Sequence, residues 1–228
     1  MYLASETTMT VMTDYGEKIP GGFFDEKSHI YRNAQGVRVP STTQIFNILG
    51  LTDFDGIPPD VLEWKRNYGI AVHAAVEFLV ADDLNWDTLD EQIIPAVTGL
   101  ECFLKKIEYQ SEAAEERKVH SLYQMEYGLT VDGRGTMLHQ GKRRHVIFDL
   151  KSGAKSSPTW RWQIGGYTVA QEKVDGGWMG LVAQFDKTGK VTPHYIDVIP
   201  AQREFQILLA AANLKLNNGL YKWGNGNG

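Results

Sequence analysis

Hydrophobic residues recur at two different spacings along the chain, and the spacing changes near residue 118. Between about residues 44 and 107 the apolar positions follow helical spacing. The longest such segment runs from about Asp60 to Val80, with apolar residues every three or four positions: Val61, Trp64, Tyr68, Ala71, Val72, Ala75 and Leu79. Two shorter helices are predicted. One covers 44–49, with N-cap candidates at 41–43 and its end at Gly50, and the other runs from Pro95 to Ile107.

After residue 118 apolar and polar residues alternate, which is typical of strands. Two strands are predicted at 118–127 and 130–139, with Gly128 between them. A turn at Gln140-Gly141-Lys142 leads into the apolar strand Val146–Leu150. These segments together predict an antiparallel meander of about three strands.

The remaining segments mix both patterns. A hairpin is predicted at 28–40, a helix from Thr159 to Lys173, two strands at 178–185 and 192–198, and a final helix at 201–217. The mixture predicts an α+β fold, in which helices pack against a mixed sheet.

No linker or internal repeat divides the chain, so residues 1–228 are predicted to form a single domain. Residues 1–27 are weakly patterned and are interpreted as a possible N-terminal arm or an added strand. The glycine- and asparagine-rich tail at 224–228 is predicted to be flexible.

Composition narrows the class of protein. The net charge of −5 does not indicate a strongly basic nucleic-acid binder, although Lys142, Arg143, Arg144 and His145 form a local basic cluster. That cluster is equally well read as a solvated hairpin tip. A single cysteine, Cys102, excludes an internal disulfide and a multi-cysteine metal site. No membrane span and no secretory signal is apparent, so a cytoplasmic protein that does not enter the membrane is predicted.

The segment Phe148-Asp149-Leu150-Lys151 carries the most informative chemistry. Side chains alternate across a strand, so Asp149 and Lys151 share one face. A carboxylate there can bind a divalent cation, and the ammonium group beside it can face a scissile phosphate. The pair therefore indicates a site that hydrolyses phosphodiesters.

Other candidate residues lie on neighbouring elements. His73 shares one side of its predicted helix with Gly69 and Glu77 and is a candidate metal ligand, or else a histidine at the edge of the core. Gln163 and Tyr167 lie four residues apart on the helix that follows the Asp149 strand. Two further groups are ambiguous when taken alone, since Glu126 reads equally as a surface carboxylate and Arg161 lies between two tryptophans that pack well in a core.

The order of these residues resembles the PD-(D/E)XK nuclease superfamily, and most of all its RecB-type and phage exonuclease branch. The resemblance rests on five segments: Gly69-x-x-x-His73, Glu126, Gly135-Thr136-Met137, Asp149-Leu150-Lys151 and Gln163-x-x-x-Tyr167. The opening His29-Ile30-Tyr31 and Val39–Ile45 is also similar to the front of phage exonucleases. The resemblance covers about residues 28–175 and implies a restriction-endonuclease-like fold with a central mixed sheet flanked by helices.

The resemblance also implies roles. His73, Asp149 and Glu126 would bind Mg²⁺ or Mn²⁺. Asp149, Lys151 and Glu126 would act in catalysis. Gln163, Tyr167 and Arg161 would bind the substrate, which is DNA. A phage recombination or host protein is a possible further partner.

One segment departs from the family pattern. The family's usual Gly-Thr-Ile-Asp appears here as Gly135-Thr136-Met137-Leu138, so a leucine stands where a metal-binding acid is expected. Glu126 is the favoured substitute. Asp132 lies six residues before Leu138, about 20 Å along a strand, which is too far. Two alternatives stay open: a shift of one residue, which would bring in His139, or a protein that has lost cleavage.

The first prediction is thus a metal-dependent DNA nuclease, an exonuclease of phage or mobile-element origin. The second is an impaired protein on the same scaffold that binds DNA or a protein partner without cutting. The third is an unrelated α+β protein in which Asp149 and Lys151 are paired by chance.

Overall fold

A computed structural model describes residues 12–52, 58–153 and 156–223 and is built on a central five-stranded sheet. The strands are β6 (Gln110–Leu122), β7 (Met125–His139), β8 (Lys142–Ser152), β9 (Trp178–Phe185) and β10 (Val191–Ile196). Their order in the sheet is β10-β9-β8-β7-β6. Since β8 and β9 run parallel and the other pairs antiparallel, the sheet is mixed, and the predicted α+β class is confirmed.

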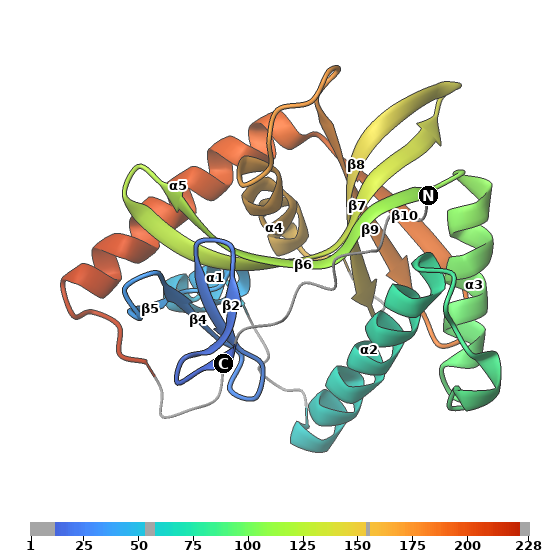
Figure 1. Cartoon of the computed structure of the whole chain (residues 1–228), viewed down its shortest axis with the longest axis horizontal. Helices are drawn as coiled ribbons and strands as arrows, with labels where there is room; N and C mark the ends of the chain where they lie inside the picture. Colours follow the sequence, from blue (N-terminus) through green and yellow to red (C-terminus); the bar gives the residue numbers. More distant parts are fainter. Residues whose placement is uncertain (1–11, 53–57, 154–155, 224–228) are drawn as a thin grey trace, which may run out of the picture.

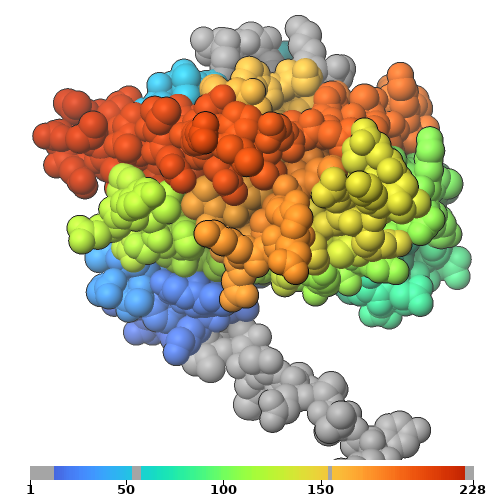
Figure 2. Space-filling view, turned by 90° about the horizontal axis from the view of Figure 1, so that it is seen from above, coloured from blue at the N-terminus to red at the C-terminus, as the bar shows by residue number. Residues whose placement is uncertain are grey.

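Helices cover both faces of this sheet, as Figure 1 shows. The elements are α1 (Thr42–Leu49), α2 (Pro59–Val80), the short 3₁₀ helix η1 (Trp86–Thr88), α3 (Ile94–Lys106), α4 (Pro158–Val169) and α5 (Val198–Asn217). One face packs on α2 and α3, and the other on α1, α4 and α5. In Figure 2, α5 forms the outer layer of its side of the molecule. None of the described helices is long and apolar enough to cross a membrane.

Strand β8 is buried on both sides, which explains its apolar run. Phe148 and Leu150 join the core under α2 and α3, whereas Ile147 joins the core under α4 and α5. The crossover from β8 through α4 to β9 returns the chain parallel to β8. The C-terminal end of β8 therefore lies beside the first strand–helix connection of that crossover, and this is where Lys151 is located.

The N-terminal segment forms a second, antiparallel five-stranded sheet. Its strands are β1 (Met12–Thr13), β2 (Gly16–Ile19), β3 (Gly22–Asp25), β4 (Ile30–Asn33) and β5 (Arg38–Val39), paired in chain order. The predicted hairpin at 28–40 is confirmed as β4 and β5. Residues 12–27, interpreted as part of an arm, belong to this sheet, whereas residues 1–11 and the tail at 224–228 lie outside the described residues. That the chain is a single domain stays a prediction.

The predicted break at Gly128 is wrong. Strand β7 runs unbroken from Met125 to His139, and the turn lies earlier, at Tyr123-Gln124. Gly128 is needed for close contact between the two sheets, because a Cβ atom there would lie 2.0 Å from Cγ of Tyr31. The Gly128 amide also donates a 2.9 Å hydrogen bond to the Pro40 carbonyl. Glycine here permits the N-terminal sheet to approach β7 rather than ending the strand.

The N-terminal sheet covers the end of β6 and β7. Tyr31, Phe24 and Val119 belong to one small core between the two sheets. Figure 2 shows the N-terminal sheet in blue against the light-green β6–β7 hairpin. The predicted helices are confirmed with end shifts of a few residues, and α1 begins with a capping box in which Ser41 and Gln44 bond each other's backbone amides.

Candidate functional site

Strand register aligns three carboxylates in one row across the main sheet. Glu115 of β6 lies between the pairs Ala114–Gly133 and Glu116–Val131, so it stands opposite Asp132 of β7. Asp132 comes one residue before the pair Gly133–Phe148, which places it level with Asp149 of β8. Directly opposite residues on paired strands lie close together. The row is therefore a consequence of the two hairpins that join β6, β7 and β8.

Asp132 stands where β7 parts from β8. The last ladder pair is Gly133–Phe148, and beyond it the Leu150 amide donates a 2.7 Å hydrogen bond to Oδ2 of Asp132. The same Oδ2 lies 3.5 Å from Nδ1 of His73. His73 is brought there by α2, whose Val72 and Val76 are buried against the sheet. The side chain of Asp132 thus takes the place of a backbone carbonyl and meets the helix.

Glu115 completes a compact group of ligand atoms. One ligand atom from each of His73, Glu115 and Asp132 lies within 4.8 Å of the other two. The backbone of Glu115 has φ = +48°, an unusual value for a residue with a long side chain inside a strand. Strained backbone of this kind concentrates at functional sites. The strain supports the view that the position of this carboxylate matters for more than folding.

Asp149 and Lys151 lie beside this group. Nζ of Lys151 is 2.7 Å from Oδ2 of Asp149, and the Asp149 side chain is only 1% exposed. Neither carboxylate oxygen of Asp149 has a well-aligned hydrogen bond from the described residues. A buried carboxylate normally has several such bonds, so these oxygens have free capacity for a ligand.

The buried acids differ in their tendency to ionise. Burial raises the pKa of Glu115 to about 7, and the neighbouring Asp132 adds to the effect. Burial also raises the pKa of Asp149 to about 6, although Lys151 opposes the shift. For Asp132 burial is outweighed by His73, Lys151 and the Leu150 amide, so its pKa is lowered. Burial likewise opposes protonation of His73, but Asp132 outweighs it and raises the pKa of the imidazole.

The donor set fits a divalent cation. His73, Glu115 and Asp132 offer one imidazole nitrogen and two carboxylate groups to one point. Hard divalent cations take oxygen ligands, and imidazole joins them at many transition-metal sites. The unsatisfied oxygens of Asp149 lie in the same electrostatic cluster, since Asp132 and His73 both act on its pKa. These residues could therefore hold a metal ion.

The group opens into a cleft of about 700 Å³. His73, Glu115, Asp132 and Lys151 line it from α2 and the main sheet. The N-terminal sheet forms the far wall with Phe24, Glu26, His29 and Tyr31, and Lys65, Arg66 and Arg117 bring positive charge. The cleft can thus accept an anionic ligand beside the candidate metal site.

Gln163 and Tyr167 of α4 also line the cleft and contact each other. The Gln163 side-chain amide donates to the Tyr167 hydroxyl, and both residues are buried. Their position four residues apart on one helix turns both toward the end of β8. The structure thereby brings together the predicted residues His73, Asp149, Lys151, Gln163 and Tyr167.

Glu126 and Leu138 lie elsewhere. Glu126 accepts a 2.7 Å hydrogen bond from Nδ2 of Asn33 and is not among the residues that line the cleft. Leu138 lies opposite Arg143 near the β7–β8 turn and is 37% exposed. The family pattern predicts the metal-binding acid at residue 138, and Asp132 is predicted to lie too far along the strand to replace it. That prediction is wrong, because Asp132 is the acid that lies beside His73.

Arg161 also lies away from the cleft. It is ion-paired with Glu204 of α5, which accepts a 2.8 Å hydrogen bond from the Trp162 indole as well. Trp160 and Trp162 pack against the core formed with α5. The contacts therefore give this segment of α4 a role in joining α4 to α5.

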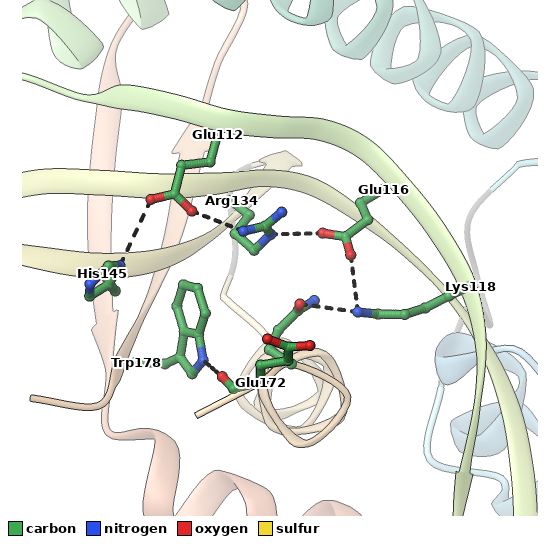
Figure 3. Close-up of polar contacts among 8 residues, drawn as sticks. Glu112, Glu116, Lys118, Arg134, His145, Glu172 and Trp178 are labelled. Carbon is green, nitrogen blue, oxygen red and sulfur yellow. Dashed lines mark hydrogen bonds and ion pairs between the residues drawn. The ribbon is translucent and has the colours of Figure 1, made fainter. Parts of the chain in front are cut away.

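The opposite face of β6 and β7 carries a second charge cluster, shown in Figure 3. Nε and Nη1 of Arg134 donate 2.9 Å hydrogen bonds to Glu116 and Glu112. Lys118 donates 3.0 Å hydrogen bonds to Glu116 and to Gln171, after α4. This outer cluster, defined as Glu112, Glu116, Lys118, Arg134 and Gln171, fixes β6 to β7 and so holds Glu115 in place.

Comparisons with known proteins identify no family for this chain. The chain matches no known protein-family profile and no curated protein. Among solved structures it is similar to one named "Putative exonuclease" from Eubacterium rectale, with a TM-score of 0.42 and 11% identity over 78% of this chain and 74% of that chain. It is also similar to SSO0001, with a TM-score of 0.32 and 12% identity over 65% of this chain and 74% of that chain. Neither likeness is close enough to support an inference about this chain.

Proposed function

We propose that the protein is a metal-dependent nuclease that hydrolyses phosphodiester bonds in DNA. The observation that carries the proposal is the row of Glu115, Asp132 and Asp149, with His73 and Lys151 beside it. All of these except the buried Asp149 line one cleft. Three buried acids grouped with one imidazole and one ammonium group are costly to fold around unless a cation is bound there.

The residues of the site are assigned separate roles in metal binding, charge stabilisation and substrate orientation. His73, Glu115 and Asp132 would hold Mg²⁺ or Mn²⁺, with Asp149 beside them. A bound divalent cation polarises a phosphoryl oxygen and makes water a better nucleophile at neutral pH. Lys151 lines the cleft, and its ammonium group, paired with Asp149, would stabilise the negative charge that develops on the phosphate. Gln163 and Tyr167 line the cleft next to Lys151 and orient the substrate strand.

The resemblance to the RecB-type branch favours an exonuclease within this class. The size of the cleft agrees with that choice, because about 700 Å³ is the range of small-molecule pockets and admits part of one strand. A phage or mobile-element origin follows only from the same resemblance.

The alternative is an impaired protein that binds without cutting, suggested by Leu138 at the acid position. The carboxylate of Asp132 beside His73 supports the active enzyme over that alternative. We therefore propose the active enzyme.

The test is a cleavage assay on linear and circular DNA with Mg²⁺, with Mn²⁺ and with chelator. Wild-type protein should degrade linear DNA only when metal is present, and circular DNA slowly or not at all. Lys151→Ala should reduce the rate by at least about 100-fold, the usual cost of removing a charge-stabilising donor.

Glu126→Gln is the matched control, because it removes a carboxylate of β7 outside the cleft. It should cleave as wild type does. Metal-independent cleavage, or equal loss of activity in Lys151→Ala and Glu126→Gln, would contradict the proposal.

A further inference from the structure

One arginine that lines the cleft has a buried donor without a partner among the described residues. Arg117 of β6 is part of the cleft wall, and its side chain is 29% exposed. Its Nε is buried and has no hydrogen-bond partner. Nη2 lies 3.6 Å from Oε2 of Glu115, which is close enough for an ion pair but too far for a hydrogen bond. The guanidinium group therefore has donors that a ligand in the cleft can use.

The strand register places Arg117 next to the candidate metal ligands. Arg117 is paired with Thr130 of β7. Two residues earlier on β6, Glu115 stands opposite Asp132. All four of these residues line the cleft, and two residues of a strand span about 7 Å. The arginine thus belongs to the next row of side chains after the metal ligands.

The N-terminal sheet holds the guanidinium group in a fixed orientation. Cζ of Arg117 lies over the Phe24 ring, 5.0 Å from its centroid. Phe24 is itself buried and packs on Tyr31, with the ring centroids 4.7 Å apart. An aromatic face attracts the cation, and because the guanidinium group is planar, packing on the ring limits its rotation. The donors of Arg117 are therefore oriented before a ligand binds.

The neighbouring acid does not satisfy this arginine. Glu115 is one of the three candidate metal ligands, so a bound cation would compete with Arg117 for its carboxylate. The arginine then requires another anion in the cleft. A guanidinium group forms two parallel hydrogen bonds with phosphate oxygens, which a single carboxylate oxygen at 3.6 Å does not supply.

We infer that Arg117 binds a phosphate of the substrate strand next to the scissile one and so positions the strand across the metal site. This inference rests on the proposed nuclease function and adds a binding residue to it. Lys151 acts on the scissile phosphate, whereas Arg117 holds its neighbour. A contact with the phosphate carries no information about the bases, so the strand is held in place whatever its sequence.

The test measures how strand binding depends on salt. A fluorescent oligothymidine is titrated at a series of NaCl concentrations with a Lys151→Ala parent and with the same parent carrying Arg117→Met, Arg117→Lys or Arg38→Met. Lys151→Ala slows cleavage, so Mn²⁺ can be present, and the series is repeated in chelator.

Arg38 is the matched control. Its Nε is also buried without a partner among the described residues, and its guanidinium group lies 4.1 Å from the centroid of the Trp223 ring. It does not line the cleft. The two arginines thus share their local chemistry and differ in their access to a bound strand.

Arg117→Met should bind oligothymidine about 10- to 150-fold more weakly at low salt, the usual loss for a hydrogen bond to a charged group. The slope of log K against log salt should become less negative by about 0.7, because one phosphate contact is lost. Arg117→Lys keeps the charge without the planar fork, so it should keep the slope of the parent and bind more weakly. Arg38→Met should match the parent in both quantities.

If Arg117→Met has the affinity and salt slope of Arg38→Met, the phosphate contact is refuted and the nuclease proposal stands. Weaker binding with an unchanged slope also refutes it, because the arginine then acts through its packing on Phe24. Should Arg117→Met not fold, parent-like affinity of Arg117→Lys refutes the contact. If the unsubstituted protein cuts no DNA with Mg²⁺ or Mn²⁺, the proposed function fails, whereas absence of strand binding by the parent refutes the contact itself.

Discussion

The acidic residues of β6, β7 and β8 form two groups, the outer cluster and the acids beside the cleft, and the two groups differ in how their carboxylates are paired. On the outer face Glu112 and Glu116 each receive a hydrogen bond from Arg134, and Lys118 adds another. Beside the cleft, the buried Asp149 of the adjoining strand β8 has one ion-pair partner, Lys151, and neither of its oxygens has a well-aligned hydrogen bond from a described residue. The outer carboxylate Glu116 thus receives hydrogen bonds from two cationic side chains, whereas Asp149 keeps capacity for a further ligand.

The difference separates a structural role from a binding role. A saturated carboxylate cannot easily take another ligand, and its pairs stabilise the fold. A buried carboxylate that lacks hydrogen bonds costs stability, which a fold tolerates where a ligand is bound. The cleft acids are therefore expected to control activity and metal binding, and the outer cluster to control stability.

Activity should show the largest effect. Asp132→Asn keeps the shape of the side chain but removes the charge beside His73, so we expect at least about a 1000-fold loss of metal-dependent cleavage. Glu116→Gln, on the outer face of the neighbouring strand, should retain nearly full activity. Steady-state rates on linear DNA distinguish the two. If both variants lose activity equally, the acids beside the cleft and those of the outer cluster do not differ in role.

Metal affinity should follow the same division. Glu115→Gln should weaken Mn²⁺ binding by more than the about 10- to 100-fold typical of losing a residue that merely supports a ligand. Isothermal titration with Mn²⁺ measures this. Leu138→Asp should add no affinity, because residue 138 lies near the β7–β8 turn, away from the cleft. A gain of affinity in Leu138→Asp would restore the alignment that the structure corrects.

The stability of the metal-free protein should fall as the pH rises through about 6 to 7. Asp149 and Glu115 have folded pKa values of about 6 and about 7, above their unfolded values, so the folded state binds more protons in this range. Its unfolding free energy therefore decreases with increasing pH. The raised pKa of His73 acts in the same direction, whereas the lowered pKa of Asp132 acts only under more acidic conditions.

Thermal unfolding in chelator across this pH range tests that sign. Glu115→Gln should flatten the dependence, and added Mn²⁺ should largely abolish it, because metal binding stabilises the ionised carboxylates. A stability that rises through the same range would contradict the assignment.

The smallest effect is expected for the outer cluster. Arg134→Met should lower the unfolding free energy by about 1 kcal/mol, because its two ion pairs are only partly buried. Urea unfolding measures the change. Mn²⁺ affinity should be unchanged, provided that β6 keeps its register; a large loss of affinity would mean that the cluster positions Glu115 more strongly than it stabilises the fold.

Much of the fold could be predicted from the sequence, because periodicity determines which residues are buried. The helices, the hairpin at 28–40 and strands β8 and β9 follow from spacing and turn residues alone. Lys151 and Asp149 could be paired because alternation fixes which side chains share a face of a strand.

One wrong prediction arises from Gly128. Local pattern predicts a break there, which places a turn inside β7. The actual reason for glycine, the contact with Tyr31, depends on a residue almost a hundred positions away, and local pattern contains no trace of it.

Part of the acid row was within reach of the sequence, because counting back from the predicted turn at Gln140-Gly141 puts Asp149 level with Asp132. The match of Asp132 with Glu115 needs the turn at Tyr123-Gln124, which local pattern does not predict. Matching residues to the motif order of the nuclease superfamily gives Leu138 instead. The approach of His73 and the distance of Arg161 from the cleft could not be predicted, because both depend on how helices pack on the sheet.

The tight turns at 123–124 and 140–141 fix the number of residues between each turn and the carboxylates of the row. An extra residue inserted at either tip lengthens a loop in solvent and leaves all three carboxylates in line. One inserted between a tip and the row shifts that strand by a single position, which turns its acid toward the opposite layer of helices. Natural variants of this protein should consequently differ in length at 123–124 and 140–141, and hardly at all along the strands between those tips and the acids.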